Sequence, residues 1–216
     1  MTKTPARAER VRDAARTRVD LLKVATEMFA EDGYSGARVD KIAERSRTTK
    51  RMIYYYFGGK EQLYMAVLEN AYKGIRDAES GLVVGNLGPV DAMRKLAELT
   101  YDYHTEHEEF IRLVSIENIH RGEFLRQVES LRPMAAPVAS LLEELLKQGR
   151  AAGVFRQGVD AIDVHMLISA YCVFQVANRY TFGHLFGRNL QDESLRDHHR
   201  SMIGDVVVGW LTTLED

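Results

Sequence analysis

Apolar residues recur at helical spacing along almost the whole chain, and this pattern limits the fold more than any other feature. Between positions 16 and 31 they return every three or four residues, as one buried helix face requires. No segment alternates apolar and polar residues with period two, and the chain contains only 4 Pro. We therefore predict an all-α fold without a sheet. The expected helices cover residues 16–31, 39–45, 49–57, 60–79, 90–107, 109–120, 123–154, 161–186 and 193–214.

Glycine and proline divide this pattern into parts. Residues 81–89 hold three glycines and a proline, which makes them the clearest loop. Pro133 and Pro137 fall inside the expected helix 123–154 and predict a kink or break there. We interpret residues 1–15 as a basic flexible arm, 16–60 as a small three-helix domain and 61–216 as a larger helical bundle.

Charge is distributed unevenly between these parts. Residues 1–60 carry 14 Lys and Arg against 8 Asp and Glu, whereas the remainder carries 15 against 23. The basic excess in residues 1–60 indicates that this part meets a polyanion. The single cysteine, Cys172, rules out an intrachain disulfide and is typical of a reducing compartment. Because the N-terminal segment is polar and no apolar run approaches about 18 residues, we expect a cytoplasmic protein with no membrane partner.

Residues 16–57 contain three short predicted helices with a tight turn before the third, which is the layout of a helix-turn-helix. Such a motif exposes polar side chains at the start of its third helix, where they read base edges. Thr49 can cap that helix with its hydroxyl, while Lys50 and Arg51 can donate to phosphate or to guanine. Four aromatics at 54–57 end the helix, and they cannot all be buried because neighbouring residues point about 100° apart.

This stretch resembles the DNA-binding signature of the TetR (tetracycline-repressor-like) family. The resemblance covers about residues 16–68 and rests on 39–45, on 49–63, and on the preceding Ala25, Phe29, Gly33 and Tyr34. It implies an N-terminal helix-turn-helix domain and a C-terminal helical bundle that forms a homodimer and binds a small-molecule effector. The function it implies is a ligand-responsive transcription regulator, a repressor, that binds a pseudo-palindromic operator in double-stranded DNA.

The resemblance also implies roles for single residues. Thr49, Lys50 and Arg51 correspond to positions that enter the major groove. Tyr54 and Tyr55 correspond to positions that hold phosphates, for which phenolic hydroxyls are suitable donors. Lys60 opens the next helix, where its ammonium and the backbone amides would meet a phosphate.

Three positions depart from the family pattern. Arg38 stands where a small capping hydroxyl is usual, and we interpret it as a phosphate contact. Arg47 stands in the turn where glycine is usual, and a positive φ there would cost about 1 kcal/mol, which a local contact would offset. Thr48 replaces an apolar residue just after the turn, and we include it among the expected DNA contacts.

In the second half the resemblance is architectural only. The resemblance implies that the last two helices form the dimer surface, and each of them carries an apolar stripe at helical spacing. The expected interface residues are Tyr171, Val206, Val207 and Trp210, with Trp210 as an aromatic anchor. An effector pocket needs apolar walls with a few placed polar groups. The residues that we expect to line it are Tyr101, His104, Asn118, Phe174 and Asn178.

Several alternatives stay open at this point. The basic residues of the arm would follow the minor groove or the phosphate backbone, or else form a solvated tail. His104 and His107 are spaced to share a metal ion, but solvated histidines are favoured and we expect no metal and no cofactor. An enzyme would need convergent catalytic groups, and we find no glycine-rich phosphate loop, nucleophile elbow or paired metal motif. A helical dimer that has lost DNA binding is the third reading.

Overall fold

The computed structural model describes the backbone of residues 5–213 and the side chains from Ala14 onwards. Every regular element in this range is helical, which confirms the predicted all-α class. The chain forms two compact units. The first comprises the chain up to Ala71 together with Arg112–Glu129, and the second comprises Tyr72–Ile111 and the chain from Ser130 onwards.

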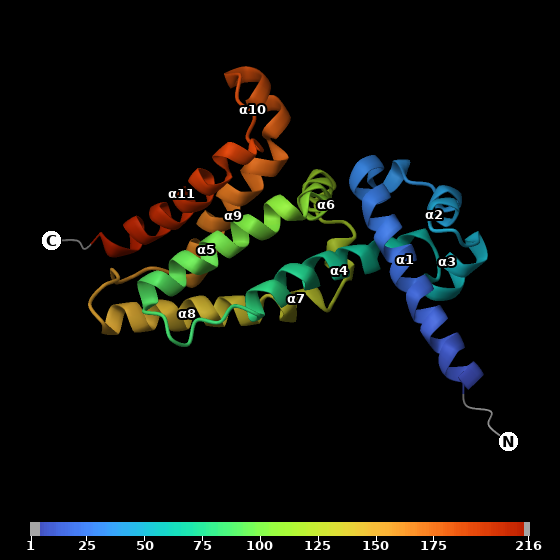
Figure 1. The fold of residues 1–216 in the computed structure, drawn as a ribbon, viewed down its shortest axis with the longest axis horizontal. Helices are drawn as coiled ribbons and strands as arrows, with labels where there is room; N and C mark the ends of the chain where they lie inside the picture. Colours follow the sequence, from blue (N-terminus) through green and yellow to red (C-terminus); the bar gives the residue numbers. More distant parts are fainter. Residues whose placement is uncertain (1–4, 214–216) are drawn as a thin grey trace. The chain divides into compact units, whose positions relative to one another are not determined.

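The first unit is built from α1 (Pro5–Gly36), α2 (Val39–Arg45), α3 (Lys50–Phe57), the first half of α4 (Lys60–Ser80) and the second half of α6 (Glu108–Ile119). Within the unit, α2 contacts both α1 and α3 (Figure 1). The core is apolar and continuous across these helices. Its fully buried members include Leu21, Ala25, Phe29, Ile42, Ile53, Leu63, Tyr64 and Val67.

The interpretation of residues 1–15 as a flexible arm needs correction, because α1 already begins at Pro5. The segment is rich in alanine and arginine, which are strong helix formers, and a proline at the first helical position is favourable. Gly33 interrupts α1 with a φ of 70°, two residues after the end of the expected helix 16–31. Lys3 and the side chains of Arg7, Arg10 and Arg12 lie outside the described residues.

The expected domain boundary at residue 60 is also shifted. The first unit continues through α4 to Ala71 and regains Arg112–Glu129 from later in the chain. The reason is an aromatic cluster, in which the Phe124 ring lies 4.3 Å from the Tyr34 ring and 5.1 Å from the Tyr64 ring. Leu113 of α6 is buried in the same core. Local patterns along the chain cannot reveal such a return.

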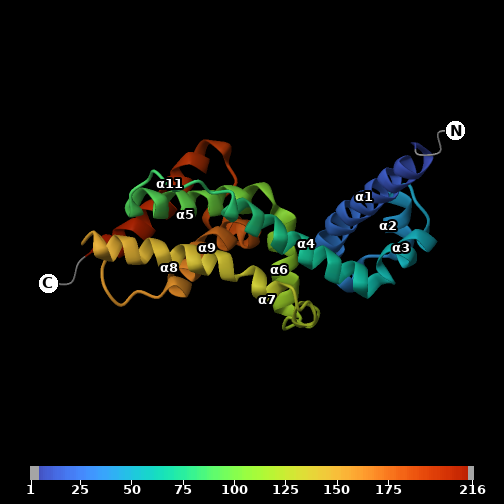
Figure 2. The same ribbon diagram turned by 90° about the horizontal axis from the view of Figure 1, so that it is seen from below.

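In the second unit, α5 (Pro89–Glu106) is central. It contacts α8 (Ala136–Ala151), α9 (Ala161–Ala177) and α11 (Glu193–Thr212), and Figure 1 shows α8 and α11 on opposite sides of it. The α9 helix contacts α5, α8 and α11 (Figure 2). The core among them includes Met93, Leu96, Leu142, Phe155, Val164, Cys172 and Val207.

Two long helices expected from the sequence are divided. Residues 123–154 contain the 3-10 turn η1 (Leu125–Gln127), the short α7 (Leu131–Met134) and α8, because Pro133 and Pro137 lack the N–H that a continuous helix needs. Residues 161–186 divide at Asn178 into α9 and α10 (Arg179–Phe186), which are bent by 72°. Across residues 5–213 no single helix is long and apolar enough to span a membrane, and α9 with α10 meets that test only as a bent pair.

Candidate functional site

The orientation of α3 follows from which of its side chains are buried. Ile53 and Phe57 lie in the core of the first unit and hold α3 against Ile42 and Ala43 of α2. Thr49 is the N-cap residue with extended backbone, but its hydroxyl makes no capping hydrogen bond. The helix therefore presents its opposite face and its first turn to the exterior of the unit.

That outward face carries the residues expected to bind DNA. Lys50, Arg51, Tyr54 and Tyr55 are all exposed, with 52% of Tyr54 and 76% of Tyr55 accessible. Within the described residues, neither Lys50 nor Arg51 forms an ion pair or a side-chain hydrogen bond, and α3 contains no acidic residue. Two unneutralised cations beside two exposed phenols form a surface suited to a polyanion.

The cations of the neighbouring α2 region are arranged differently. Arg38 precedes α2 and binds Asp40 through two hydrogen bonds of 3.1 and 2.7 Å, which lowers the pKa of the Asp40 carboxyl. Lys41 pairs with Glu44 at 2.8 Å, and Arg45 pairs with Glu27 at 3.0 Å. The expected phosphate contact of Arg38 would therefore compete with Asp40.

Lys60 opens α4 and is half-buried. Its Nζ lies 4.8 Å from the centre of the Tyr34 ring and donates to the Ser35 carbonyl oxygen at 3.4 Å. Burial lowers the pKa of this ammonium. The ring and the carbonyl hold the side chain in place while leaving it without an acidic partner among the described residues.

The turn between α2 and α3 has a positive φ at Arg47, the position where the family usually has glycine. Arg47 has a φ of 53° and is exposed, and Thr48 after it is half-buried. The backbone N–H of Arg47 donates to the Glu44 carbonyl at 3.1 Å, and the backbone N–H of Thr48 donates to the Ala43 carbonyl at 2.9 Å. Arginine thus occupies a left-handed position that favours glycine.

The residues expected to bind an effector are divided between the two units. Tyr101 and His104 are buried on α5 in the second unit, whereas Asn118 is exposed on the part of α6 that belongs to the first unit. Phe174 is exposed on α9 and stacks edge-on with Phe182 of α10 at 5.4 Å. Asn178 caps the junction between α9 and α10. Tyr101 lines a cleft of the second unit.

Two clefts open in the second unit. One, of about 230 Å³, lies beside Tyr101 and is lined further by Thr105, Glu108, Leu190, Gln191, Asp192, Glu193 and Arg196. The other, of about 380 Å³, is lined by Ala78, Leu82, Lys95, Leu99, Asp102, Tyr103, Glu106 and Arg200. The first cleft is mainly polar, with Tyr101 and Leu190 as its apolar side chains, whereas the second combines apolar side chains with charged groups.

One charged pair inside the second unit, Arg76 with Glu79, was missed by the sequence reading. Arg76 pairs with Glu79 on α4, where burial raises the pKa of the Glu79 carboxyl to about 7. Burial lowers the pKa of His104 to about 4, so the ring is neutral at pH 7. Its Nδ1 lies 2.7 Å from the Thr100 carbonyl and must donate to it. In the sequence the pair of Arg76 and Glu79 shows only as opposite charges three residues apart, a pattern that is equally common on exposed helix faces and so does not indicate burial.

The expected dimer residues divide between surface and core. Val206 is 47% exposed on α11, and Trp210 is half-buried one turn later. Val207 is fully buried in the core of its own unit, so its assignment to the dimer surface is corrected. Tyr171 is half-buried and donates its hydroxyl to the His199 carbonyl at 3.2 Å.

No group of three or more metal-ligating side chains occurs among the described residues. His104 and His107 each direct Nδ1 to a backbone carbonyl, that of Thr100 and that of Tyr103 respectively. Cys172 is buried, which raises the pKa of its thiol to about 12, as expected for a small core residue.

Comparison with known proteins agrees with this geometry. A model of bacterial regulatory proteins of the tetR family matches residues 21–67, and a model of the tetracyclin repressor-like C-terminal domain matches residues 89–207, more than half of the chain. The transcriptional repressor NicS of Pseudomonas putida is 32% identical over 92% of this chain and 94% of its own length.

Solved structures share the fold. The regulator SCO4942 of Streptomyces coelicolor is 27% identical, has a TM-score of 0.68, and is matched over 90% of this chain and 98% of its own. FadR of Bacillus subtilis, solved in complex with stearoyl-CoA, is 16% identical with a TM-score of 0.68 over 90% of this chain and 99% of its own, a likeness of fold alone. The family models and the long match to a repressor lead to one assignment. This chain belongs to the tetR family of bacterial regulatory proteins, a family of transcription regulators.

Proposed function

We propose that the chain is a ligand-responsive transcriptional repressor that binds a pseudo-palindromic operator as a homodimer in the cytoplasm. The observation that carries the proposal is the exposed face of α3, where Lys50 and Arg51 have no acidic partner among the described residues. A cation kept free of intramolecular pairs is available to a phosphate or to the acceptors of guanine. The similarity to the repressor NicS supports the same function.

In this proposal α3 enters the major groove, with Lys50 and Arg51 near the bases and with Tyr54 and Tyr55 at the phosphates. One short helix reads too few bases to define a site, so two copies related by a two-fold axis bind two half-sites. The ammonium of Lys60, held over the Tyr34 ring, adds a phosphate contact from the start of α4. Arg38 would join only by exchanging Asp40 for a phosphate.

The test is selection of genomic DNA fragments by the purified full chain, followed by footprinting of the strongest binder. We expect a protected palindrome whose affinity falls steeply with salt and falls again in Arg51→Ala. Lys147→Ala, which removes an exposed cation from α8, is the matched control and should bind normally. If no fragment is enriched at low salt, before or after unfolding and refolding to release a bound ligand, the proposal fails.

The dimer surface in this proposal consists of the exposed apolar residues of α9 and α11. Ile162, Met166 and Phe174 lie on α9, and Val206 lies on α11 close to Trp210. Apolar side chains gathered on two neighbouring helices favour association with another apolar surface. Met166→Glu combined with Val206→Glu should yield a monomer in sedimentation, whereas Val83→Glu, at an exposed apolar position in a loop, should leave the dimer intact.

For the effector we propose the cleft of about 230 Å³ beside Tyr101, whose polar and charged lining suits a small molecule with polar groups. A thermal-shift screen of small metabolites against the full chain would supply a hit. Thr105→Trp, which fills this cleft, should abolish the shift and the release of operator by that hit. Leu99→Trp fills the other cleft and is the control, and loss of the response in this variant alone would move the effector site there.

A further inference from the structure

The turn that leads into α3 holds an arginine in a backbone conformation that L side chains rarely adopt. Arg47 has a φ of 53°, and the hydrogen bonds from its own N–H and from that of Thr48 close a Schellman motif at the end of α2. Glycine is the usual residue at this position because it has no Cβ to clash with the backbone. The arginine side chain gives the turn no advantage that glycine lacks.

The same motif recurs at the end of α8 with the ordinary residue. Gly153 has a φ of 68°, its N–H donates to Arg150 at 3.0 Å, and that of Val154 donates to Gly149 at 2.9 Å. Arg121 repeats the unusual choice at the end of α6, with a φ of 59°. Among the described residues, Arg47 and Arg121 are the only non-glycine residues with positive φ.

The side chain of Arg47 makes no compensating contact inside the protein. It is exposed, and across residues 14–213 it forms no ion pair, side-chain hydrogen bond or contact with an aromatic ring. The three cations that precede it are all paired, Arg38 with Asp40, Lys41 with Glu44, and Arg45 with Glu27. Arg47 is therefore the first unpaired cation on the chain segment that leads into Lys50 and Arg51.

We propose that Arg47 binds a phosphate of the operator, adding to the DNA interface a residue from the turn itself. It lies two positions before the N-cap Thr49, at the same end of α3 as Lys50 and Arg51. A guanidinium matches phosphate oxygens with two parallel N–H donors, and an external phosphate supplies the contact that the protein does not. The proposal rests on the proposed function, because it requires an operator.

The decisive variant is Arg47→Gln, which keeps a polar side chain with the same backbone constraint and removes the charge together with the guanidinium donors. Losing one phosphate contact in each copy of a dimer should make the slope of log affinity against log salt shallower by about 1.8. Affinity measured from 50 to 200 mM salt should then fall about tenfold less in the variant than in the wild type. Arg47→Lys should retain most of the wild-type slope.

Arg121→Gln is the matched control, because it removes an exposed arginine with the same φ from the end of α6. It should leave operator affinity and salt slope unchanged. The loss in Arg47→Gln should also be equal on operator and on unrelated duplex DNA, since phosphates carry no sequence. An unchanged slope in Arg47→Gln, an equal change in Arg121→Gln, or a loss confined to the operator would each overturn the proposal. Failure of the wild type to bind any DNA would instead reject the proposed function.

Discussion

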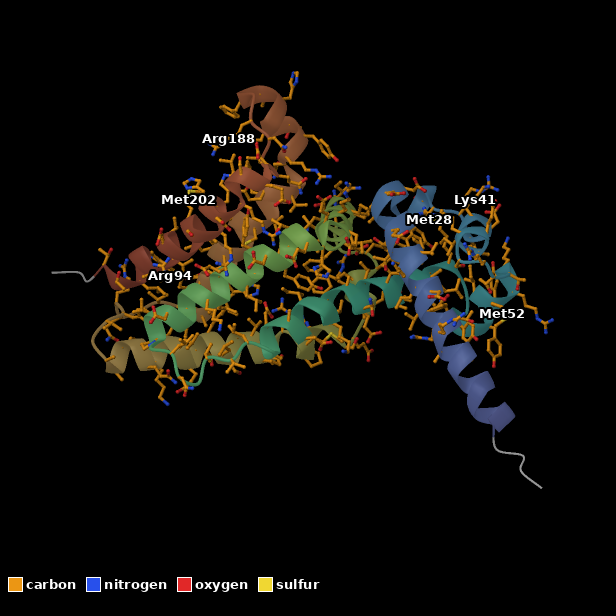
Figure 3. All side chains as sticks on the ribbon, viewed as in Figure 1. Met28, Lys41, Met52, Arg94, Arg188 and Met202 are labelled. Carbon is orange, nitrogen blue, oxygen red and sulfur yellow. The ribbon has the colours of Figure 1, made fainter. Side chains whose placement is uncertain are left out.

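The cations that join α5 to α11 are paired with carboxylates, whereas those of α3 have no acidic partner among the described residues. In the second unit Arg94 pairs with Asp205 at 2.6 Å, and Arg200 pairs with Glu98 and Asp102, each at 2.8 Å. Figure 3 shows Arg94 on α5, with α11 close by. In the first unit Lys50 and Arg51 have no such partner within the described residues. The cations that link α5 to α11 are neutralised by carboxylates, whereas those of α3 are left available to a binding partner.

This difference separates stability from binding. A cation neutralised by carboxylates gives the unit little attraction for DNA, and its removal is felt mainly in the free energy of unfolding. An unpaired exposed cation contributes almost nothing to folding, and its removal is felt when a polyanion binds. Mutation of the paired cations should therefore change mainly the free energy of unfolding, and mutation of the unpaired cations should change mainly the affinity for DNA.

The strongest test of the comparison is Arg51→Ala. We expect operator affinity to fall about 100-fold, because a direct contact is worth about 1–3 kcal/mol and a dimer loses two of them. The free energy of unfolding in urea should be unchanged, since Arg51 has no partner among the described residues. Fluorescence anisotropy with a labelled operator measures the first quantity. A variant that unfolds more easily and binds normally would break the comparison.

The second prediction concerns pH and the interior of the second unit. His104 is buried with a pKa of about 4 against an ordinary value of 6.5, because burial disfavours its charged form. A pKa depressed in the folded state means that its stabilising contribution is present above pH 6.5 and is lost as pH falls toward 4. Between pH 7 and 5 the free energy of unfolding should therefore drop by about 2 kcal/mol through this residue.

Urea unfolding of the wild type and of His104→Gln at both pH values isolates this contribution. The pKa of His165 and that of His199 are also lowered, so only the difference between the two proteins reports His104. The drop should be smaller by about 2 kcal/mol in the variant. Equal pH dependence in the two proteins would show that His104 is not held neutral by burial.

Features that depend on neighbouring residues could be predicted from the sequence, whereas features that depend on contacts between distant parts of the chain could not. The bounds of α2 and the end of α3 agree with expectation, because caps, turns and helical periodicity act over a few residues. The return of Phe124 and Leu113 to the core of the first unit was not predictable, since it depends on contacts that join distant parts of the chain. The break at Asn178 was missed because apolar residues continue through it.

The candidate site shows the same limit. The exposure of Lys50, Arg51, Tyr54 and Tyr55 on α3 agrees with expectation, but which cations form ion pairs could not be predicted. Arg38 looks available in sequence, yet it binds Asp40 two positions later. Val206 and Val207 are neighbours in one apolar run, and a packed partner helix decides which of them points inward.

A smaller effect is expected from the paired cations of the second unit. Arg200→Ala removes the bonds from α11 to Glu98 and Asp102 on α5. Because this arginine is about one-third exposed, solvent screens the pairs, and we expect a loss of about 1 kcal/mol in the free energy of unfolding. Operator affinity per folded dimer should stay within about twofold of the wild type. A large loss of affinity without a loss of stability would show that Arg200 acts in DNA binding rather than in stabilising the second unit.

The smallest expected effect is the change of stability in Arg47→Gly. This variant tests stability and DNA binding at the same residue. The left-handed conformation costs an L residue about 1–2 kcal/mol, while glycine loses about 0.5–1 kcal/mol more conformational freedom on folding, so the variant should be more stable by about 0.5 kcal/mol. Arg121→Gly should gain about the same, because its backbone conformation is nearly identical. Urea unfolding of both variants, set beside their operator affinities, separates the two roles. Arg47→Gly should gain stability while losing affinity for DNA, whereas Arg121→Gly should gain stability alone. If both gained stability and neither lost affinity, the unpaired charge of Arg47 would serve no partner, and the contrast between free and paired cations would be confined to α3.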